Sequence, residues 1–185
     1  MKKLLLILMS TIIAGGAMAG TKPFNLSLTP DVAVYDRNTV IEGLTLSIWG
    51  ENPQTSFALG FVNGSTGQSA GLSLGLLNYA ENYRGLQWAL VNYTGQDTSG
   101  WQGGFGFGIA VSALNYTGGT MKGLQTGVVN YAGKLTGLQL GLVNYAKTAD
   151  AGVQIGLVNI IPQNEWFTRL PDELAPGMIL VNWRF

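Results

Sequence analysis

The sequence contains no cysteine and no histidine. Without cysteine the chain makes no disulfide and carries no lipid anchor on a cysteine that follows a signal sequence. Without histidine it lacks the commonest general base of hydrolytic enzymes, and with both absent it lacks the usual ligands of zinc, copper and haem. We therefore expect a protein that is not an enzyme, with no catalytic residues, no cofactor and no metal site.

Charged residues are scarce, at 11% of the chain, and the 10 Lys and Arg balance the 10 Asp and Glu. No basic patch stands out, so nucleic acid is not an expected partner. A water-facing strand surface normally carries Lys, Glu and Thr. The sparse charge therefore indicates that much of the surface meets something other than water.

What the chain does have is a repeated segment, whose clearest copy is GLQLGLVNYA at residues 137–146. Near copies align on an asparagine, at successive spacings of 15, 14, 23, 15, 14, 15 and 23 residues: Asn63, Asn78, Asn92, Asn115, Asn130, Asn144, Asn159 and Asn182. Such a period means that one structural unit is used repeatedly. Within a unit, Leu138, Leu140 and Leu142 alternate with small or weakly polar residues such as Gln139 and Gly141. This period of two indicates β-strands.

The first prediction is an all-β fold, an antiparallel transmembrane β-barrel of about ten strands. Each unit offers roughly the ten residues that a tilted strand needs to cross a hydrocarbon core, and charged residues such as Glu81, Arg84 and Lys134 fall between units. The large apolar face would contact lipid, and the Gln and Gly face would line a narrow lumen. A barrel of about eight strands remains if residues 24–36 and 43–50 lie outside the wall.

A β-solenoid with coils of 14 to 15 residues is the alternative fold. In it, equivalent asparagines of successive coils would form hydrogen-bonded ladders, and the leucines would fill the core. One observation favours this alternative. If Trp183 and Phe185 face lipid, alignment on the asparagine places Tyr145, Val143 and Gly141 outward and turns the leucines inward. The pattern alone leaves open which strand face meets lipid.

Both ends of the chain carry signals of export. Residues 1–19 have a basic start, an apolar run over residues 4–13 and an A-x-A cleavage motif at residues 17–19, which together predict a secretory signal peptide. Residues 20–185 would then form one repeat-built β domain. The final Trp183 and Phe185 resemble the C-terminal signature of outer-membrane barrels. In those proteins the last strand closes the barrel and is recognised by the barrel-assembly machinery.

The GLQxGLVNYA segment resembles the repeats of a family of bacterial surface-repeat proteins assigned to the outer membrane, over residues 57–182. The resemblance implies location in the outer membrane of a Gram-negative-type bacterium, with outer-membrane lipid as a partner. We expect a structural or surface-interaction role through the outer loops. The candidate partner-binding residues lie in the segment 161–177 and are Trp166, Phe167, Arg169, Asp172 and Glu173. A small pore for ions or solutes is the alternative function, and a secreted β-solenoid surface protein is the second alternative.

Overall fold

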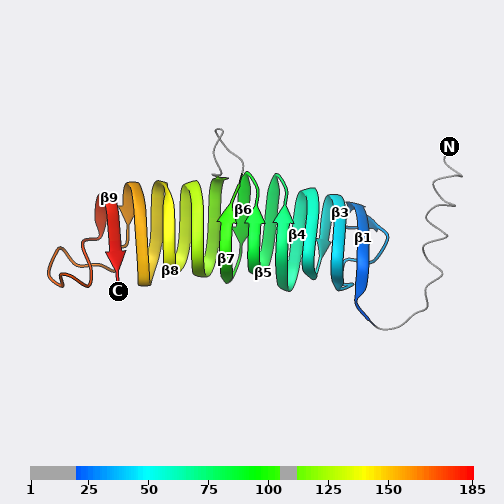
Figure 1. The fold of residues 1–185 in the computed structure, drawn as a ribbon, viewed down its shortest axis with the longest axis horizontal. Helices are drawn as coiled ribbons and strands as arrows, with labels where there is room; N and C mark the ends of the chain where they lie inside the picture. Colours follow the sequence, from blue (N-terminus) through cyan, green and yellow to red (C-terminus); the bar gives the residue numbers. More distant parts are fainter. Residues whose placement is uncertain (1–19, 105–111) are drawn as a thin grey trace, which may run out of the picture.

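The computed structural model describes residues 20–104 and 112–185, so the predicted signal peptide lies outside the described residues. The described chain winds into an elongated β-solenoid (Figure 1). Within these two segments there is no helix, and therefore none long and apolar enough to cross a membrane. The barrel prediction is wrong, and the alternative prediction of a solenoid is confirmed.

The described residues form nine strands that belong to one hydrogen-bonded sheet. In chain order they are β1 (Lys22–Thr29), β2 (Val32–Ala33), β3 (Ile41–Asn52), β4 (Gln54–Leu74), β5 (Leu77–Trp88), β6 (Val91–Thr94), β7 (Thr98–Gly103), β8 (Ser112–Ile160) and β9 (Gly177–Arg184). The longest, β8, continues through successive coils, because its backbone bends at the corners without losing its pairing.

Neighbouring coils pair in parallel, from β1 and β3 through to β7 and β8. Tyr79 of β5 stands directly beside Tyr93 of β6, so equivalent residues of successive repeats are neighbours. In an antiparallel barrel they would lie at opposite ends of adjoining strands. The wrong part of the barrel prediction is the antiparallel direction of neighbouring strands. Side chains alternate with period two in both parallel and antiparallel sheets, so the alternation does not show which of the two forms.

Each coil has a corner at which two successive side chains both face outward. Leu142 and Val143 are 51% and 36% exposed, which shifts the alternation by one residue. Gln139 before the corner, and Asn144 and Ala146 after it, are therefore all fully buried. The leucines face outward and the amides inward, as in the barrel prediction. The leucine core predicted for the solenoid is wrong.

Two ladders of amide side chains fill the interior. One runs through Asn63, Asn78, Asn92, Asn115, Asn130, Asn144 and Asn159, with Nδ2 to Oδ1 distances of 2.8–3.0 Å. The other runs through Gln87, Gln102, Gln125, Gln139 and Gln154, with Nε2 to Oε1 distances of 2.7–2.9 Å. The predicted asparagine ladder is confirmed. The interior of these coils is occupied by buried, mutually bonded amides.

The glycine beside the outward-facing corner lies directly against the preceding coil. A Cβ on Gly141 would lie 2.2 Å from the carbonyl oxygen of Gly127 in the preceding coil. No side chain fits at that distance, so the glycine of GLQLG is required by the close approach of two coils. Further from this corner the interior holds a small apolar cluster of Met121, Ala132, Leu135, Ala146, Ala149 and Ile161.

Both ends of the solenoid are closed by irregular segments. At the N-terminal end, Asn52 Nδ2 donates hydrogen bonds to the carbonyl oxygens of Asp36 and Thr39, at 2.9 and 3.1 Å. At the C-terminal end, β9 pairs antiparallel with the last part of β8. The strand that carries Trp183 and is followed by Phe185 thus ends a solenoid and closes no barrel.

Candidate functional site

A row of exposed apolar side chains runs along the outward-facing corner of the coils. We call it the apolar ridge, and its members are 36% to 60% exposed: Ile48, Trp49, Phe61, Leu76, Leu90, Val129, Leu142, Val143, Leu157 and Val158. The row is continuous because the parallel register stacks equivalent corners, as in the pairs Trp49 with Val62 and Leu77 with Val91. Soluble monomers rarely expose a contiguous apolar surface of this kind, so the ridge is a candidate interaction surface.

The surfaces on both sides of the ridge are also apolar or aromatic. On one side Trp88 and Trp101 meet edge to face at 5.0 Å, and Leu59 and Ile155 are nearly half exposed. On the other side four tyrosines stack with ring centroids 4.7–5.3 Å apart: Tyr93, Tyr116, Tyr131 and Tyr145. The apolar surface therefore wraps around the ridge and is not confined to one flat face.

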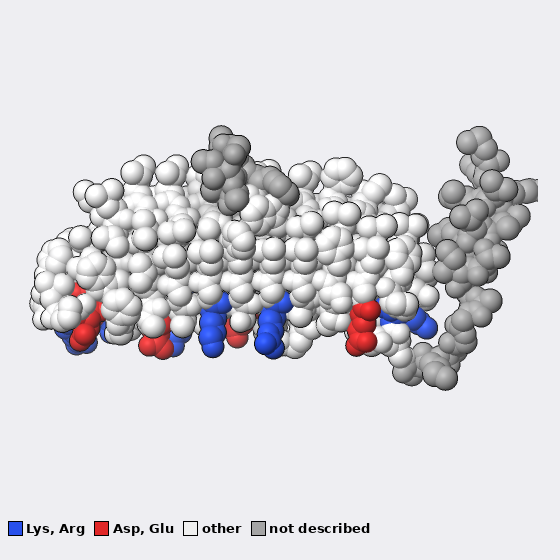
Figure 2. All heavy atoms as spheres, in the orientation of Figure 1, with Lys and Arg blue, Asp and Glu red and all other residues white. Residues whose placement is uncertain are grey.

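Charged side chains gather along the opposite edge of the solenoid (Figure 2). Between residues 54 and 160 the chain has seven charged residues, and the charged side chains in Figure 2 keep to this edge: Glu81, Arg84, Asp97, Lys122, Lys134, Lys147 and Asp150. We call this edge the charged corner. Lys134 Nζ lies 3.1 Å from Asp150 Oδ2 in the next coil, and Asp97 Oδ1 accepts a hydrogen bond from the Thr120 backbone at 2.6 Å. Each coil is thus amphipathic across its width.

A shallow apolar groove of about 520 Å³ lies beside the ridge. Its lining is Leu46, Ser47, Leu59, Gly60, Phe61, Leu74, Gly75 and Leu76. The backbone around it is already paired, since Leu76 N donates to Phe61 O at 2.9 Å and Gly75 N donates to Trp88 O at 3.0 Å. A groove with few free polar groups suits a hydrocarbon chain better than a peptide strand.

A more polar hollow of about 470 Å³ has Glu51, Tyr79, Glu81 and Tyr93 among its lining residues. The Tyr79 hydroxyl donates to the Glu51 carboxylate and accepts a hydrogen bond from Trp49 Nε1 at 3.0 Å. Burial, reinforced by that bond to Glu51, raises the pKa of Tyr79 to about 12. Tyr79 therefore stays neutral at physiological pH and acts as a hydrogen-bonded link between coils.

Four of the five predicted partner-binding residues lie on the surface of the C-terminal segment. Trp166 and Phe167 are 65% and 49% exposed, and Asp172 is also exposed. Arg169 Nη2 lies 3.3 Å from Glu165 Oε1 in a solvent-exposed ion pair. The structure brings an aromatic pair and an ionic pair together on one loop, and their role in partner binding remains a prediction.

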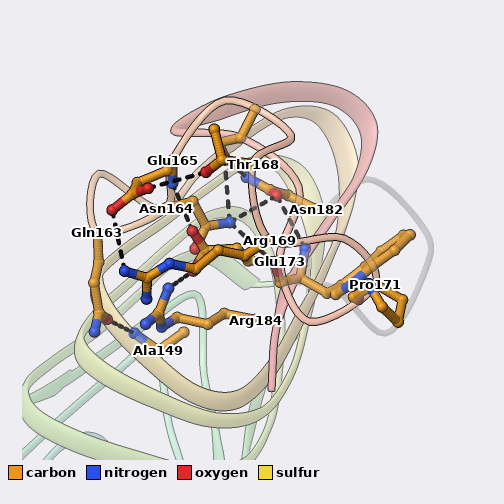
Figure 3. A network of polar contacts seen from close by, with 12 residues as sticks. Ala149, Gln163, Asn164, Glu165, Thr168, Arg169, Pro171, Glu173, Asn182 and Arg184 are labelled. Carbon is orange, nitrogen blue, oxygen red and sulfur yellow. Dashed lines mark hydrogen bonds and ion pairs between the residues drawn. The ribbon is translucent and has the colours of Figure 1, made fainter.

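The fifth predicted residue, Glu173, is only 2% exposed. Its carboxylate forms an ion pair with Arg184 of β9 and accepts a hydrogen bond from the Glu165 backbone N–H at 2.8 Å. These contacts hold the loop against the last strand (Figure 3). Glu173 therefore orders the loop and is not available to a partner.

Within the part of the chain that the structure describes, no group of three or more His, Cys, Asp or Glu side chains could hold a metal ion. The main feature that sequence reasoning missed is the ridge corner itself. Its signal is the pair of successive apolar residues before each asparagine, such as Leu142 and Val143.

Comparisons with protein-family models, with curated proteins and with solved structures give no match.

Proposed function

We propose that the protein is an exported, non-enzymatic β-solenoid that binds a lipid membrane through the apolar ridge and presents its C-terminal loop to a surface partner. The observation that carries the proposal is the placement of the ridge and the charged corner on opposite edges of a polar interior. The predicted signal peptide and the resemblance to surface-repeat proteins support the outer membrane of a Gram-negative-type bacterium as its location.

Lipid is favoured over a folded protein because of the shape of the apolar surface. The ridge is convex, and apolar or aromatic side chains flank it on both sides. A folded partner would cover one flank and leave the other in water, whereas fluid hydrocarbon covers the ridge and both flanks. The stacked tyrosines add to this, because amphipathic rings are favoured at the boundary between hydrocarbon and water.

The ridge is large enough to matter energetically. Its ten side chains are roughly half exposed, and full burial of one large apolar side chain contributes about 1.5 to 3 kcal/mol. Burying the exposed halves in hydrocarbon therefore contributes about 1 kcal/mol each, on the order of 10 kcal/mol before the cost of immobilisation. We expect reversible binding whose strength depends measurably on single ridge residues.

The test is flotation of the mature chain, residues 20–185, with lipid vesicles in a density gradient. Leu142→Asp places a carboxylate on the ridge. Transfer of that carboxylate into hydrocarbon costs about 3 kcal/mol, which should lower the partition coefficient of the protein into the membrane about 100-fold. Ala151→Asp is the matched control, because Ala151 is exposed at the charged corner and its φ of 57° is one that Asp tolerates.

The proposal requires that the unaltered chain floats with vesicles, that Leu142→Asp remains in the dense fraction, and that Ala151→Asp floats like the unaltered chain. Circular dichroism of each variant confirms that the β-fold is retained. An unaltered chain that stays in the dense fraction as a soluble monomer would contradict membrane binding and favour the secreted solenoid instead.

A further inference from the structure

We infer that the solenoid enters one leaflet of the bilayer only, with its long axis parallel to the membrane plane. The ridge then lies near the bilayer midplane, and the charged corner lies among the headgroups. This inference rests on the proposed function and adds the depth and the orientation of binding, which membrane association alone does not specify.

The height of the apolar surface carries the inference. Four residue steps separate Leu138, next to the charged edge, from Leu142 on the ridge, and at about 3.3 Å per step the strand rises about 13 Å. The returning strand covers the same height from Val143 to Lys147. A bilayer has a hydrocarbon core of about 30 Å, so one leaflet supplies about 15 Å. The apolar height fits one leaflet and falls far short of both.

The charged corner determines the direction of the axis. Its seven members recur from Glu81 to Asp150 along the length of the solenoid, and in Figure 2 they keep to one edge. If the axis stood upright in the bilayer, Arg84 and Lys122 of the central coils would enter hydrocarbon, which is costly for charged side chains. With the axis in the membrane plane all of them remain in water.

The tyrosine row agrees with this orientation. Tyr145 follows the ridge residue Val143 by two positions and precedes Lys147 by two positions. The stacked tyrosines therefore lie about halfway between the ridge and the charged corner, about 7 Å from the ridge, where their rings add apolar surface to the immersed flank.

The chain has no cysteine, so each introduced cysteine is a unique attachment point for a fluorescent probe. We choose Leu142→Cys on the ridge and Asp150→Cys at the charged corner, where the replaced side chain is 71% exposed. Each labelled protein is bound to vesicles of phosphatidylethanolamine and phosphatidylglycerol, which carry nitroxide quenchers either at the headgroup or near the end of the acyl chain. Flotation of the labelled protein is measured first, so failure of membrane binding is recognised separately.

For the bound protein, the probe at position 142 should have blue-shifted emission and be quenched more strongly by the deep nitroxide. The probe at position 150 should be quenched by the headgroup nitroxide and by an aqueous quencher outside the vesicles. Cysteine at position 142 should be protected from a membrane-impermeant thiol reagent on either side.

Three results would overturn the inference while leaving membrane binding intact. Reaction of the cysteine at position 142 with reagent enclosed inside the vesicles would show that the chain spans both leaflets. Stronger quenching of the ridge probe by the headgroup nitroxide would show that the solenoid lies on the surface. Formation of disulfide-linked dimers through position 142 in vesicles would show that a second copy covers the ridge.

Discussion

Replacing Asn130 by alanine should destabilise the protein far more than replacing Leu142 by alanine, the reverse of the order expected for a leucine core. Asn130 is fully buried. Its Oδ1 accepts a hydrogen bond from Asn115 Nδ2 at 2.8 Å, and its Nδ2 donates to Asn144 Oδ1 at 2.8 Å and to Leu140 O at 2.9 Å. One substitution therefore interrupts the ladder in both directions.

The expected cost follows from the groups left without partners. Asn115 Nδ2 loses its acceptor and Asn144 Oδ1 loses its donor, both in the buried interior. A buried polar group without a partner costs about 1 to 3 kcal/mol, so Asn130→Ala should cost about 3 to 5 kcal/mol. Leu142 is 51% exposed, so Leu142→Ala removes little packing and should cost less than about 1 kcal/mol.

The measurement is guanidinium denaturation of the mature chain in a mild detergent, followed by circular dichroism. Midpoints and slopes are compared among the unaltered chain and the two variants, because stacked repeats need not unfold in a single step. In a core of leucines, Leu142→Ala would cost about 2 to 5 kcal/mol. A large loss for Leu142→Ala with little change for Asn130→Ala would refute the polar interior and the outward leucines.

Three further predictions concern the coil spacing, the C-terminal cap and high pH. Gly141→Ala should cost about 1 to 3 kcal/mol in the same assay, because its Cβ would lie 2.2 Å from a backbone oxygen, whereas Gly177→Ala, with no atom within 4 Å, should be near neutral. Glu173→Gln breaks a buried ion pair and should speed proteolysis within residues 161–176, whereas Glu165→Gln, in an exposed pair, should not. Tyr79 has a pKa raised from 10.0 to about 12 in the folded chain, so its contribution to stability is present below pH 10 and is lost as the pH rises through about 12. Tyr79→Phe should show a smaller fall of the denaturation midpoint over that range.

The strand character of the repeat could be predicted from the residues themselves, whereas the pattern leaves open the direction of its leucines. Leu138, Leu140 and Leu142 share one face because of the period of two, and the lack of charge indicates that this face does not meet water. What the alternation does not specify is whether neighbouring strands are parallel. The recurring asparagine is the better signal. A primary amide donates and accepts, so identical amides form a ladder when equivalent strands stack in parallel and in register.

The ridge corner and the cap could not be predicted by local rules. Gly141 directly precedes the bend at Leu142 and Val143, but the close approach of two coils already accounts for that glycine, and no proline marks the bend. The bend is imposed by the ladders on either side, which require Gln139 and Asn144 to point inward together. The burial of Glu173 likewise depends on Arg184 of β9, a contact that no local pattern contains.

The two caps connect the fold to the proposed environment. Among the residues that the structure describes, the strands of an inner coil pair with a coil on either side, so the first and last coils carry the sheet edges. Unpaired edges are unfavourable in hydrocarbon. At the first coil, Val34 N donates to Leu26 O at 2.9 Å. At the last, β9 reverses the strand direction, and Phe185 N donates to Asp172 O at 2.9 Å. Because β9 runs antiparallel to β8, a further coil cannot stack on it in the parallel register of the other coils. The same caps therefore limit the solenoid to a finite length and pair backbone groups at the edges, as the proposed membrane binding requires.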